Sequence, residues 1–287
     1  MTVQPFYEIG LRSNFSFLDG ASHAEELVER ALLLGLSGLG LADRNTVAGV
    51  VRLHASAKLN GLEFRPGARL VFGDDTPELL AYPMNRKGWG NLCRMLSQGN
   101  LRSKKGICTL WQADLLEWSG DLLFVAMPPS LPETADVQTF ETRLAPIRAQ
   151  LEGRIYLALT PRYDGFDQKT FAELGGIADH LGLPLIATND AFYHAPDRKP
   201  VADVVVAIRE HLPIAEAGLH LHAHAERHLK SPAEMARLLR AWPEALDNNI
   251  RFFSRLNFSL DELSHQYPDE IFDGESPARA LRRLTYE

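Results

Sequence analysis

Short apolar runs alternate with longer amphipathic stretches from residue 7 to about residue 190. Apolar runs bounded by turn residues favour strands, and the stretches between them have the spacing of helices. We predict seven strands, at residues 7–11, 38–41, 63–71, 78–82, 121–126, 154–159 and 184–188. Repeated strand–helix units of this kind are typical of α/β folds.

Helices are predicted between these strands at residues 24–34, 46–59, 88–96 and 169–181. The first is indicated by Leu27, Val28 and Ala31 at helical spacing, and by Ser22 three residues before Glu25, as in a capping box. After residue 190 the pattern predicts only helices, at 200–212, 231–240 and 243–256. Seven strand–helix units favour a β/α barrel of the TIM type over an open doubly wound sheet, which stays the alternative because no glycine-rich phosphate loop decides between them.

These patterns divide the chain into three parts. We predict a β/α barrel at residues 1–195, an all-helical extension at 196–259, and at 260–287 a linker with the start of a further helix at Pro277. That last helical pattern reaches Glu287 without a stop signal, so we expect the natural chain to continue into another domain.

Composition excludes several classes of protein. The 287 residues have ordinary globular hydrophobicity, and no apolar run has the length of a membrane span. The N-terminus has no pattern of a secretory signal, and Cys93 and Cys108 are too few for a disulfide framework. We therefore predict a cytoplasmic protein that does not cross a membrane.

The charge is unevenly distributed. Acidic residues number 37 and basic residues 30, and this net charge of -7 argues mildly against a nucleic-acid-binding surface. Residues 79–113, however, contain no Asp or Glu and carry six basic side chains: Arg86, Lys87, Arg94, Arg102, Lys104 and Lys105. We predict that this basic stretch contacts DNA or another domain of the same protein, with a solvated helix face as the alternative.

Histidines are concentrated in one tract after the predicted barrel. His220, His222 and His224 alternate, and His228 follows. Their spacing permits metal binding, but no acidic or Cys partner except Glu226 is close in sequence, so solvated loop histidines are the favoured interpretation. His194 lies beside a predicted strand end and is expected to be structural.

Three segments at predicted strand ends carry a resemblance to a known family. They are RSNFSFLDGAS at 12–22, ADRNT at 42–46 and ATNDAFY at 187–193. Together they resemble the PHP (polymerase and histidinol phosphatase) domain at the N-terminus of bacterial C-family DNA polymerases. Residues 22–28, 41–51 and 225–231 are more similar to the error-prone, damage-induced branch than to the replicative one.

The resemblance implies a fold, an activity of the parent protein and its partners. The fold would be a distorted seven-stranded β/α barrel. The parent would be a DNA polymerase, a nucleotidyltransferase that copies damaged template, and its polymerase domain would bind Mg²⁺ beyond residue 287. The implied partners are that polymerase domain, DNA through the intact polymerase, and other mutasome or replisome proteins.

Active members of the family hold three divalent metals at the carboxyl ends of the strands, with His and acidic ligands. The positions that match those ligands here are mostly changed: Gly10 and Arg12 stand at the first His-x-His, Arg44 and Arg69 at the next His and Glu, Ala158 and Arg162 at a middle acid and His, and Phe192 at the closing His. Asp19 and Asp190 alone are retained. We therefore expect no metal and no other cofactor in this chain, and no catalytic residues.

Arginine at three of these positions suggests what replaced the metals. We predict that Arg12, Arg44 and Arg69 form charge-assisted hydrogen bonds with Asp19 and Asp190. A second interpretation is that the arginines form a phosphate-binding pocket.

Three functions follow from these interpretations. The first is a non-catalytic scaffold within an error-prone polymerase. The alternatives are an active metal-dependent phosphoesterase or proofreading nuclease, and a DNA-binding module that uses residues 79–113.

Overall fold

The apolar runs of the chain form the central strands of a mixed α/β fold. The computed structural model describes residues 4–129, 135–264 and 274–286. The strands of these residues are β1 (Tyr7–Leu11), β2 (Gly38–Leu41), β3 (Asp43–Arg44), β4 (Glu63–Arg65), β5 (Ala68–Leu70), β6 (Leu79–Pro83), β7 (Leu122–Ala126), β8 (Ile155–Leu159) and β9 (Leu185–Ala187). They are hydrogen-bonded into a three-stranded sheet, β1-β2-β4, and a six-stranded sheet, β3-β5-β6-β7-β8-β9.

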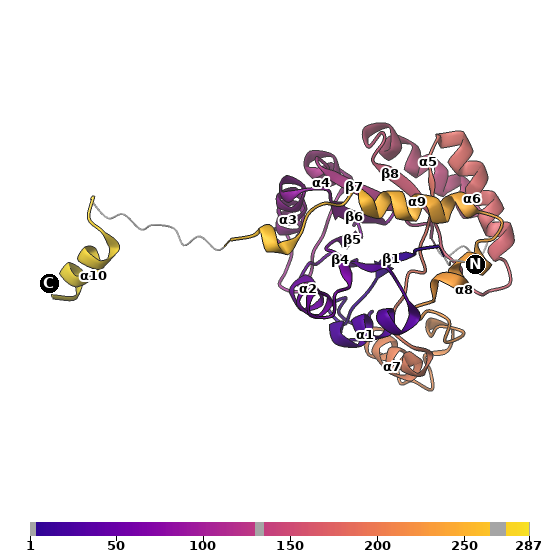
Figure 1. Ribbon diagram of the computed structural model, residues 1–287, viewed down its shortest axis with the longest axis horizontal. Coiled ribbons are helices and arrows are strands. Elements are labelled where there is room, and N and C mark those ends of the chain that lie inside the picture. Colours follow the sequence, from indigo (N-terminus) through magenta and orange to yellow (C-terminus); the bar gives the residue numbers. More distant parts are fainter. Residues whose placement is uncertain (1–3, 130–134, 265–273, 287) are drawn as a thin grey trace.

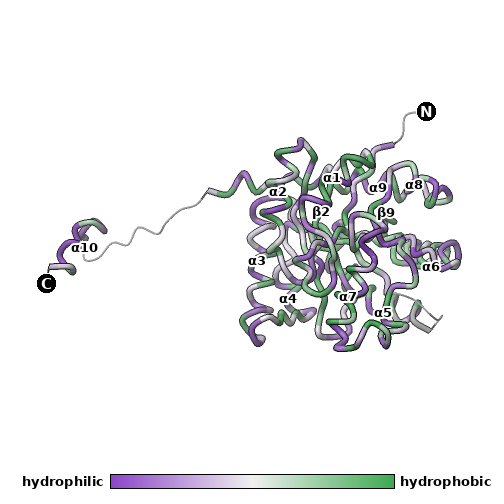
Figure 2. The backbone as a smooth tube through the Cα atoms, turned by 90° about the horizontal axis from the view of Figure 1, so that it is seen from below, coloured by the Kyte–Doolittle hydropathy of each residue, from purple (hydrophilic) through white to green (hydrophobic). Residues whose placement is uncertain are grey.

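Helices surround these strands in both views (Figures 1 and 2). The α-helices are α1 (Ala24–Leu34), α2 (Val50–Leu59), α3 (Arg86–Leu101), α4 (Gln112–Trp118), α5 (Ala135–Gln150), α6 (Asp167–Leu181), α7 (Lys199–Arg209), α8 (Pro232–Leu238), α9 (Pro243–Ser254) and α10 (Pro277–Tyr286), and the short 3-10 helices are η1 (Pro196–Arg198), η2 (Gly218–His220) and η3 (Leu260–Glu262). None of the helices in the described ranges is long and apolar enough to span a membrane.

The start of α1 lies one residue later than the Ser22–Glu25 pair predicts. His23 is the N-cap residue, and its backbone N donates to Glu26 at 2.8 Å. The Ser22 hydroxyl lies 2.8 Å from Nδ1 of His194 and accepts a hydrogen bond from the His194 backbone N at 3.0 Å. Ser22 therefore joins two loops instead of capping the helix.

The pairing of the strands differs in detail from the seven predicted strands. The segment 63–71 is broken at Pro66 and Gly67 into β4 and β5, because proline has no N–H to donate to a ladder. β3 follows β2 after one residue, yet it pairs in the other sheet. β6 runs antiparallel to both β5 and β7, whereas repeated β/α units predict parallel neighbours. The strands thus pair as two sheets, and a single seven-stranded barrel stays a prediction.

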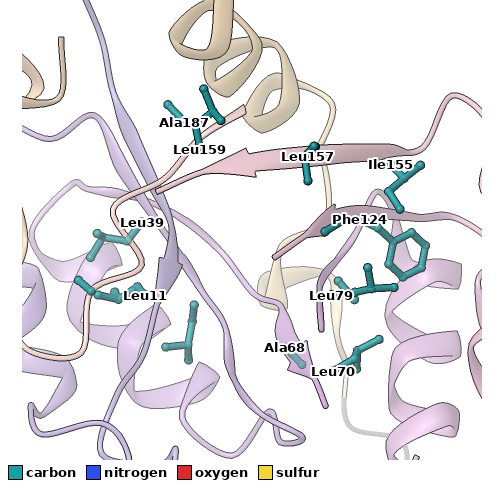
Figure 3. Packing of buried hydrophobic residues seen from close by; sticks show 14 of the residues in the cluster. Leu11, Leu39, Ala68, Leu70, Leu79, Phe124, Ile155, Leu157, Leu159 and Ala187 are labelled. Carbon is teal, nitrogen blue, oxygen red and sulfur yellow. The ribbon is translucent and has the colours of Figure 1, made fainter. Parts of the chain in front are cut away.

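Both faces of the central strands are buried. Along β6, Leu79 and Ala81 pack toward the helices, in the cluster that Figure 3 shows around Leu79 and Phe124. The alternate residues Leu80 and Tyr82 belong to a second cluster on the opposite face. Period-two alternation between two apolar environments explains why these strands are continuous apolar runs in the sequence.

The ring of Tyr82 packs within this second cluster, in space that neighbouring glycines leave open. Its hydroxyl donates a hydrogen bond to the carbonyl of Ile9, which joins β6 to β1 of the other sheet. A Cβ at Gly40 would lie 3.0 Å from the Tyr82 ring, and one at Gly67 would lie 2.5 Å from it. Glycine at these positions makes room for the aromatic side chain that links the sheets.

Helix α9, in the predicted extension, covers the second cluster. Phe252 packs edge-on against Tyr82, with ring centroids 5.8 Å apart, and Phe253 stacks on Tyr7 at 4.0 Å. Residues 196–259 therefore share a core with residues 1–195, and a domain boundary at residue 195 stays a prediction. In the predicted linker, residues 265–273 lie outside the described residues, and α10 begins at Pro277 as predicted.

The amide of Asn249 in α9 bridges β1 and β9, which are not hydrogen-bonded to each other. Its Oδ1 accepts from the backbone N of Tyr7 at 3.0 Å. Its Nδ2 donates to the carbonyls of Tyr7 at 2.7 Å and Ala187 at 3.0 Å. Asn249 is fully buried, so no water can replace these bonds.

Asn249→Ala should lower the free energy of unfolding by about 3 kcal/mol, because it leaves three buried backbone groups without a partner. Urea unfolding followed by circular dichroism measures the loss. The matched control is Asn248→Ala, which removes a single bond to the carbonyl of Leu185 at 2.8 Å and should cost about 1 kcal/mol. Equal losses for the two variants would contradict the bridging role of Asn249.

Candidate functional site

Asp190 follows β9 after Thr188 and Asn189, and its backbone has an unusual conformation. Its φ is 51°, in the left-handed region that side-chain-bearing residues seldom adopt. The backbone N donates to Glu8 at 3.2 Å, and the carbonyl accepts from Nη2 of Arg227 at 2.9 Å. Glu8, itself buried on β1, also accepts from the hydroxyl of Thr188 at 2.7 Å and the backbone N of Asn189 at 2.9 Å. A network between β1 and the end of β9 therefore orients the Asp190 side chain.

Three guanidinium groups converge on the Asp190 carboxylate. Arg12 donates to it at 3.2 Å and Arg227 at 2.6 Å, and Arg69 forms a third ion pair. All four side chains are buried. Burial alone would raise the pKa of Asp190, but Arg12, Arg69, Arg227 and Arg162 together hold it well below its usual range. Asp190 is therefore a permanent anion at the centre of a cationic cluster.

Asp19 and Phe192 extend this network. Asp19 accepts from Arg12 at 2.7 Å and from Arg209 at 3.3 Å. The guanidinium carbons of Arg12 and Arg227 lie 3.9 Å and 4.4 Å from the centroid of the Phe192 ring. Phe192 thus contributes a cation–π surface at the position where the family resemblance implies a histidine ligand.

Arg44 departs from the predicted network. Its side chain is exposed, and it forms no ion pair with the residues that the structure describes. The preceding Asp43 is buried and accepts hydrogen bonds from the backbone N and hydroxyl of Ser13, both at 2.7 Å, and from the hydroxyl of Ser16 at 2.8 Å. Successive strand residues face opposite sides, so the inward position of Asp43 directs Arg44 outward.

The sequence-based hypothesis missed the roles of Arg227 and Arg209. Arg227 lies in the long segment after the last strand, where no periodic pattern indicates which side chains point toward the strand ends. Arg209 ends α7, whose amphipathic pattern gives only its buried face. We use the name arginine cluster for Arg12, Arg69, Arg162 and Arg227.

A cavity of about 620 Å³ opens beside this cluster. All four members of the arginine cluster line it, together with Asp190, Phe192, His222 and residues of the 74–78 loop. Burial and the nearby Arg227 lower the pKa of His222 to about 4, so its imidazole is neutral at physiological pH. The positive charge of this wall therefore comes from arginine alone.

The residues at the carboxyl ends of the strands do not fit the metal cluster that the family resemblance implies. A Cβ at Gly10 would lie 2.6 Å from the Thr188 hydroxyl and 2.9 Å from Cα of Asp190, so no ligand side chain fits there. Asp190 and Asp19 are already engaged by guanidinium groups. Within the described ranges, no three His, Cys, Asp or Glu side chains come together as a metal-binding group.

The histidine tract is dispersed in the structure. His222 packs against the Phe192 ring at 4.8 Å, and Nδ1 of His224 accepts from the backbone N of Glu226 at 3.2 Å. Nε2 of His228 lies 2.7 Å from Nζ of Lys230. His220 is exposed, with its Nδ1 3.8 Å from the Glu210 carboxylate. The four imidazoles thus have different neighbours and do not converge on one point.

Three members of the basic stretch have intramolecular partners. Arg102 forms a bidentate pair with Asp114, both bonds at 2.7 Å, and Arg94 lies over the Trp118 ring at 5.4 Å. Lys87 forms an ion pair with Asp121 at 3.3 Å. Arg86, Lys104 and Lys105 are exposed and form no ion pair with other described residues. These last three are the basic side chains of the stretch that a partner can reach without breaking an existing pair.

Comparison with known proteins identifies relatives over almost the whole chain. Residues 8–174 match the family model described as the PHP domain. Error-prone DNA polymerase 1 of Rhizobium meliloti (strain 1021) is 59% identical over 283 residues, which are 98% of this chain and 25% of that protein. The error-prone DNA polymerase of Mesorhizobium japonicum is 50% identical over 290 residues, 100% of this chain and 26% of that protein. The chain thus spans about a quarter of the length of the curated relatives it matches.

The solved structures that match this chain are more distant in sequence. A putative metal-dependent phosphoesterase from Bifidobacterium adolescentis is 17% identical with a TM-score of 0.48, and the match covers 66% of this chain and 88% of that one. An amidohydrolase from Chromobacterium violaceum is 16% identical with a TM-score of 0.49, over 67% of this chain and 88% of that one.

Ionisation of the Asp43 carboxyl makes the free energy of unfolding depend on pH, and a substitution at this position removes that dependence. Burial raises its pKa to about 6, against the hydrogen bonds from Ser13 and Ser16, from an ordinary value of 3.8. The folded chain thus binds this proton more tightly than the unfolded chain. Proton binding by Asp43 therefore adds to the free energy of unfolding fully below pH 3.8, and this addition is lost as pH rises through about 6. Asn at position 43 does not titrate, so the free energy of unfolding of Asp43→Asn, relative to that of the wild type, should rise by about 3 kcal/mol between about pH 4 and pH 7.

Urea unfolding at a series of pH values measures this difference. Asp75→Asn is the control, because the Asp75 side chain is 83% exposed and its substitution should change the free energy of unfolding only slightly. A difference between Asp43→Asn and the wild type that does not change with pH would contradict the elevated pKa of Asp43.

Proposed function

Because the chain belongs to the PHP domain family, we propose that it is the N-terminal part of an error-prone DNA polymerase and serves there as a scaffold without catalysis of its own. The identity to error-prone polymerases along 98% of the chain supports the first half of this proposal. The second half rests on one observation, the occupation of the Asp190 carboxylate by Arg12, Arg69 and Arg227.

Ion pairs suit a scaffold for a physical reason. A buried carboxylate without a partner is strongly destabilising. The acidic ligands of a metal site become such unpaired carboxylates whenever the metal dissociates. Arginine carries its charge permanently, so the pairs around Asp190 persist at any metal concentration. The network therefore stabilises the strand ends without a bound ion.

We infer that the two sheets together form the distorted seven-stranded barrel of the family. One residue separates β2 from β3, and two residues separate β4 from β5. Each of these two pairs therefore counts as one continuous strand of the barrel that takes part in both sheets. The remaining seam lies between β1 and β9, where Asn249 and Glu8 supply hydrogen bonds from side chains. A closed arrangement also accounts for the second apolar cluster, which is enclosed on the inner face of the strands.

The direct partner of this scaffold would be the polymerase domain of the same parent chain. Lys104, Lys105 and Ile107 lie in the loop after α3, and Leu101 is the last residue of that helix. Leu101 is 87% exposed and Ile107 is 54% exposed. Apolar side chains among basic ones favour a protein surface over a DNA backbone as the ligand. DNA, Mg²⁺ and other mutasome or replisome proteins would then be bound by the rest of the parent polymerase.

The two alternative functions have less support. A metal-dependent phosphoesterase or nuclease requires ligands that Gly10, Arg12, Arg69 and Phe192 do not supply. A DNA-binding module would rely on basic residues of which Arg102 is already neutralised by Asp114.

The metal-free scaffold is tested by metal content and stability together. The chain, treated with EDTA, repurified and incubated with Mn²⁺ or Zn²⁺, should retain less than one tightly bound ion in inductively coupled plasma mass spectrometry. Its thermal midpoint should be the same with and without EDTA, because the network contains no ion to remove. Two or more retained ions, or a midpoint that EDTA lowers, would overturn the proposal.

Asp190→Asn should lower the free energy of unfolding by about 4 kcal/mol, equally with and without EDTA, because three buried guanidinium groups lose their common anion. Urea unfolding measures the loss. Asp121→Asn removes the ion pair with Lys87, whose side chain is 80% exposed, and keeps an oxygen that can accept from Asn85, so it should cost about 0.5 kcal/mol. A loss at Asp190 as small as that at Asp121 would show that the network contributes little to stability.

A further inference from the structure

Helix α7 has a second apolar face, which is exposed to solvent. Val201, Val204 and Ile208 lie at helical spacing and are 44%, 47% and 54% exposed. Ala202 and Val206, on the other side of the helix, are buried. Figure 1 shows α7 at the edge of the molecule, beside α1. Since a helix that is apolar on both sides is typically buried on both, the outer face, formed by Val201, Val204 and Ile208, indicates an interaction surface.

A groove of about 570 Å³ borders the outer face. Its lining residues are Val204, Ala207, Ile208, His211, Leu212 and Ile214. Phe17, which is 83% exposed, lies near the same end of α7, because the carbonyl of the next residue, Leu18, accepts from Arg209 at 3.3 Å. Five of the six lining residues are apolar, so the groove fits an aliphatic side chain.

The charged side chains of α7 form pairs away from the outer face. Lys199 donates to Asp203 at 2.6 Å, and the Asp203 side chain is only 14% exposed. Arg209 donates to Glu210 at 2.9 Å and to Asp19 at 3.3 Å. A partner that covers the outer face therefore buries no unpaired charge, which favours an apolar protein surface over a polyanion as the ligand.

The outer face is complementary to a reversed copy of itself. Val201 and Ile208 lie equally far along the helix from a point between Val204 and Val205. A two-fold axis that crosses the interface at this level places Val201 of one copy against Ile208 of the other, beside the groove. Val204 then lies next to the axis and faces Val204 of the second copy.

The charges at the two ends of α7 also favour the reversed orientation. Residues 196–199 carry two basic side chains and one acidic side chain, and residues 209–216 carry one basic and two acidic side chains. The helix dipole has the same sense, positive at the N-terminus and negative at the C-terminus. Two antiparallel α7 helices therefore bring ends of opposite sign together, whereas parallel helices would bring like ends together.

We propose that the outer face of α7 is the contact between two copies of this chain. The two α7 helices are antiparallel, and Val201 of each copy packs at the groove of the other. This inference goes beyond the proposed scaffold and is separate from it, since a monomeric chain would be equally metal-free.

Sedimentation equilibrium of the 287-residue chain over a series of concentrations tests the proposal. The average mass should rise from 32.0 kDa toward twice that value as the concentration increases. Val204→Glu should raise the Kd of the dimer about tenfold or more, because two carboxylates then face each other beside the axis. Val204→Lys should weaken the dimer for the same reason. An equimolar mixture of the two variants should dimerise more tightly than either variant alone, since Glu then faces Lys.

Val51→Glu is the matched control, because Val51 is a 66% exposed valine on α2, outside the outer face. This variant should dimerise like the wild type. Circular dichroism checks that each variant folds, and Ile208→Glu takes the place of Val204→Glu if the latter does not fold.

Three results would overturn the proposal. They are a wild-type chain that stays monomeric at every concentration, a dimer that Val204→Glu leaves unchanged, and a mixture of the Glu and Lys variants that is no tighter than either alone. The first result would leave the outer face to another part of the parent polymerase. None of the three changes the metal content or the effect of EDTA, so each leaves the metal-free scaffold intact.

Discussion

The buried negative charge of Asp190 is the constraint on which the carboxyl ends of the strands depend. A carboxylate with 3% side-chain exposure is stable only when cations surround it. Arg12 directly after β1, Arg69 on β5 and Arg227 in the segment before α8 supply those cations. The charge of one side chain therefore ties together segments that are distant in sequence.

The backbone around Asp190 is organised by the same requirement. Glu8 accepts hydrogen bonds from the residues that follow β9, and Gly10 lets β1 approach them closely. These contacts compensate for the left-handed conformation of Asp190. Tyr82, Asn249 and the aromatic side chains of α9 also join the two sheets. Polar contacts near Asp190 and apolar packing among the strands therefore both link the two sheets.

In the proposed scaffold, arginine takes the place of metal ions, and this would change how the site responds to its surroundings. A metal site gains and loses its charge with the concentration of the ion, whereas guanidinium groups are charged at every physiological pH. Arg12 and Arg69 of the arginine cluster also pair with Asp19 and Glu78, which extends the network beyond Asp190. In the proposed scaffold, these pairs would stabilise the strand ends without a bound ion.

The sequence determined the alternation of strands and helices, the family, and the identity of Arg12, Arg69 and Asp190 as members of one site, because local periodicity and short motifs encode these features. It did not determine the split of residues 63–71, the antiparallel direction of β6 or the outward position of Arg44, since strand pairing and facing depend on distant neighbours. Nor did it identify Arg227, which replaces Arg44 in the network. Only tertiary structure decides which of several arginines reaches a buried carboxylate, because the energy of an ion pair depends on distance and burial.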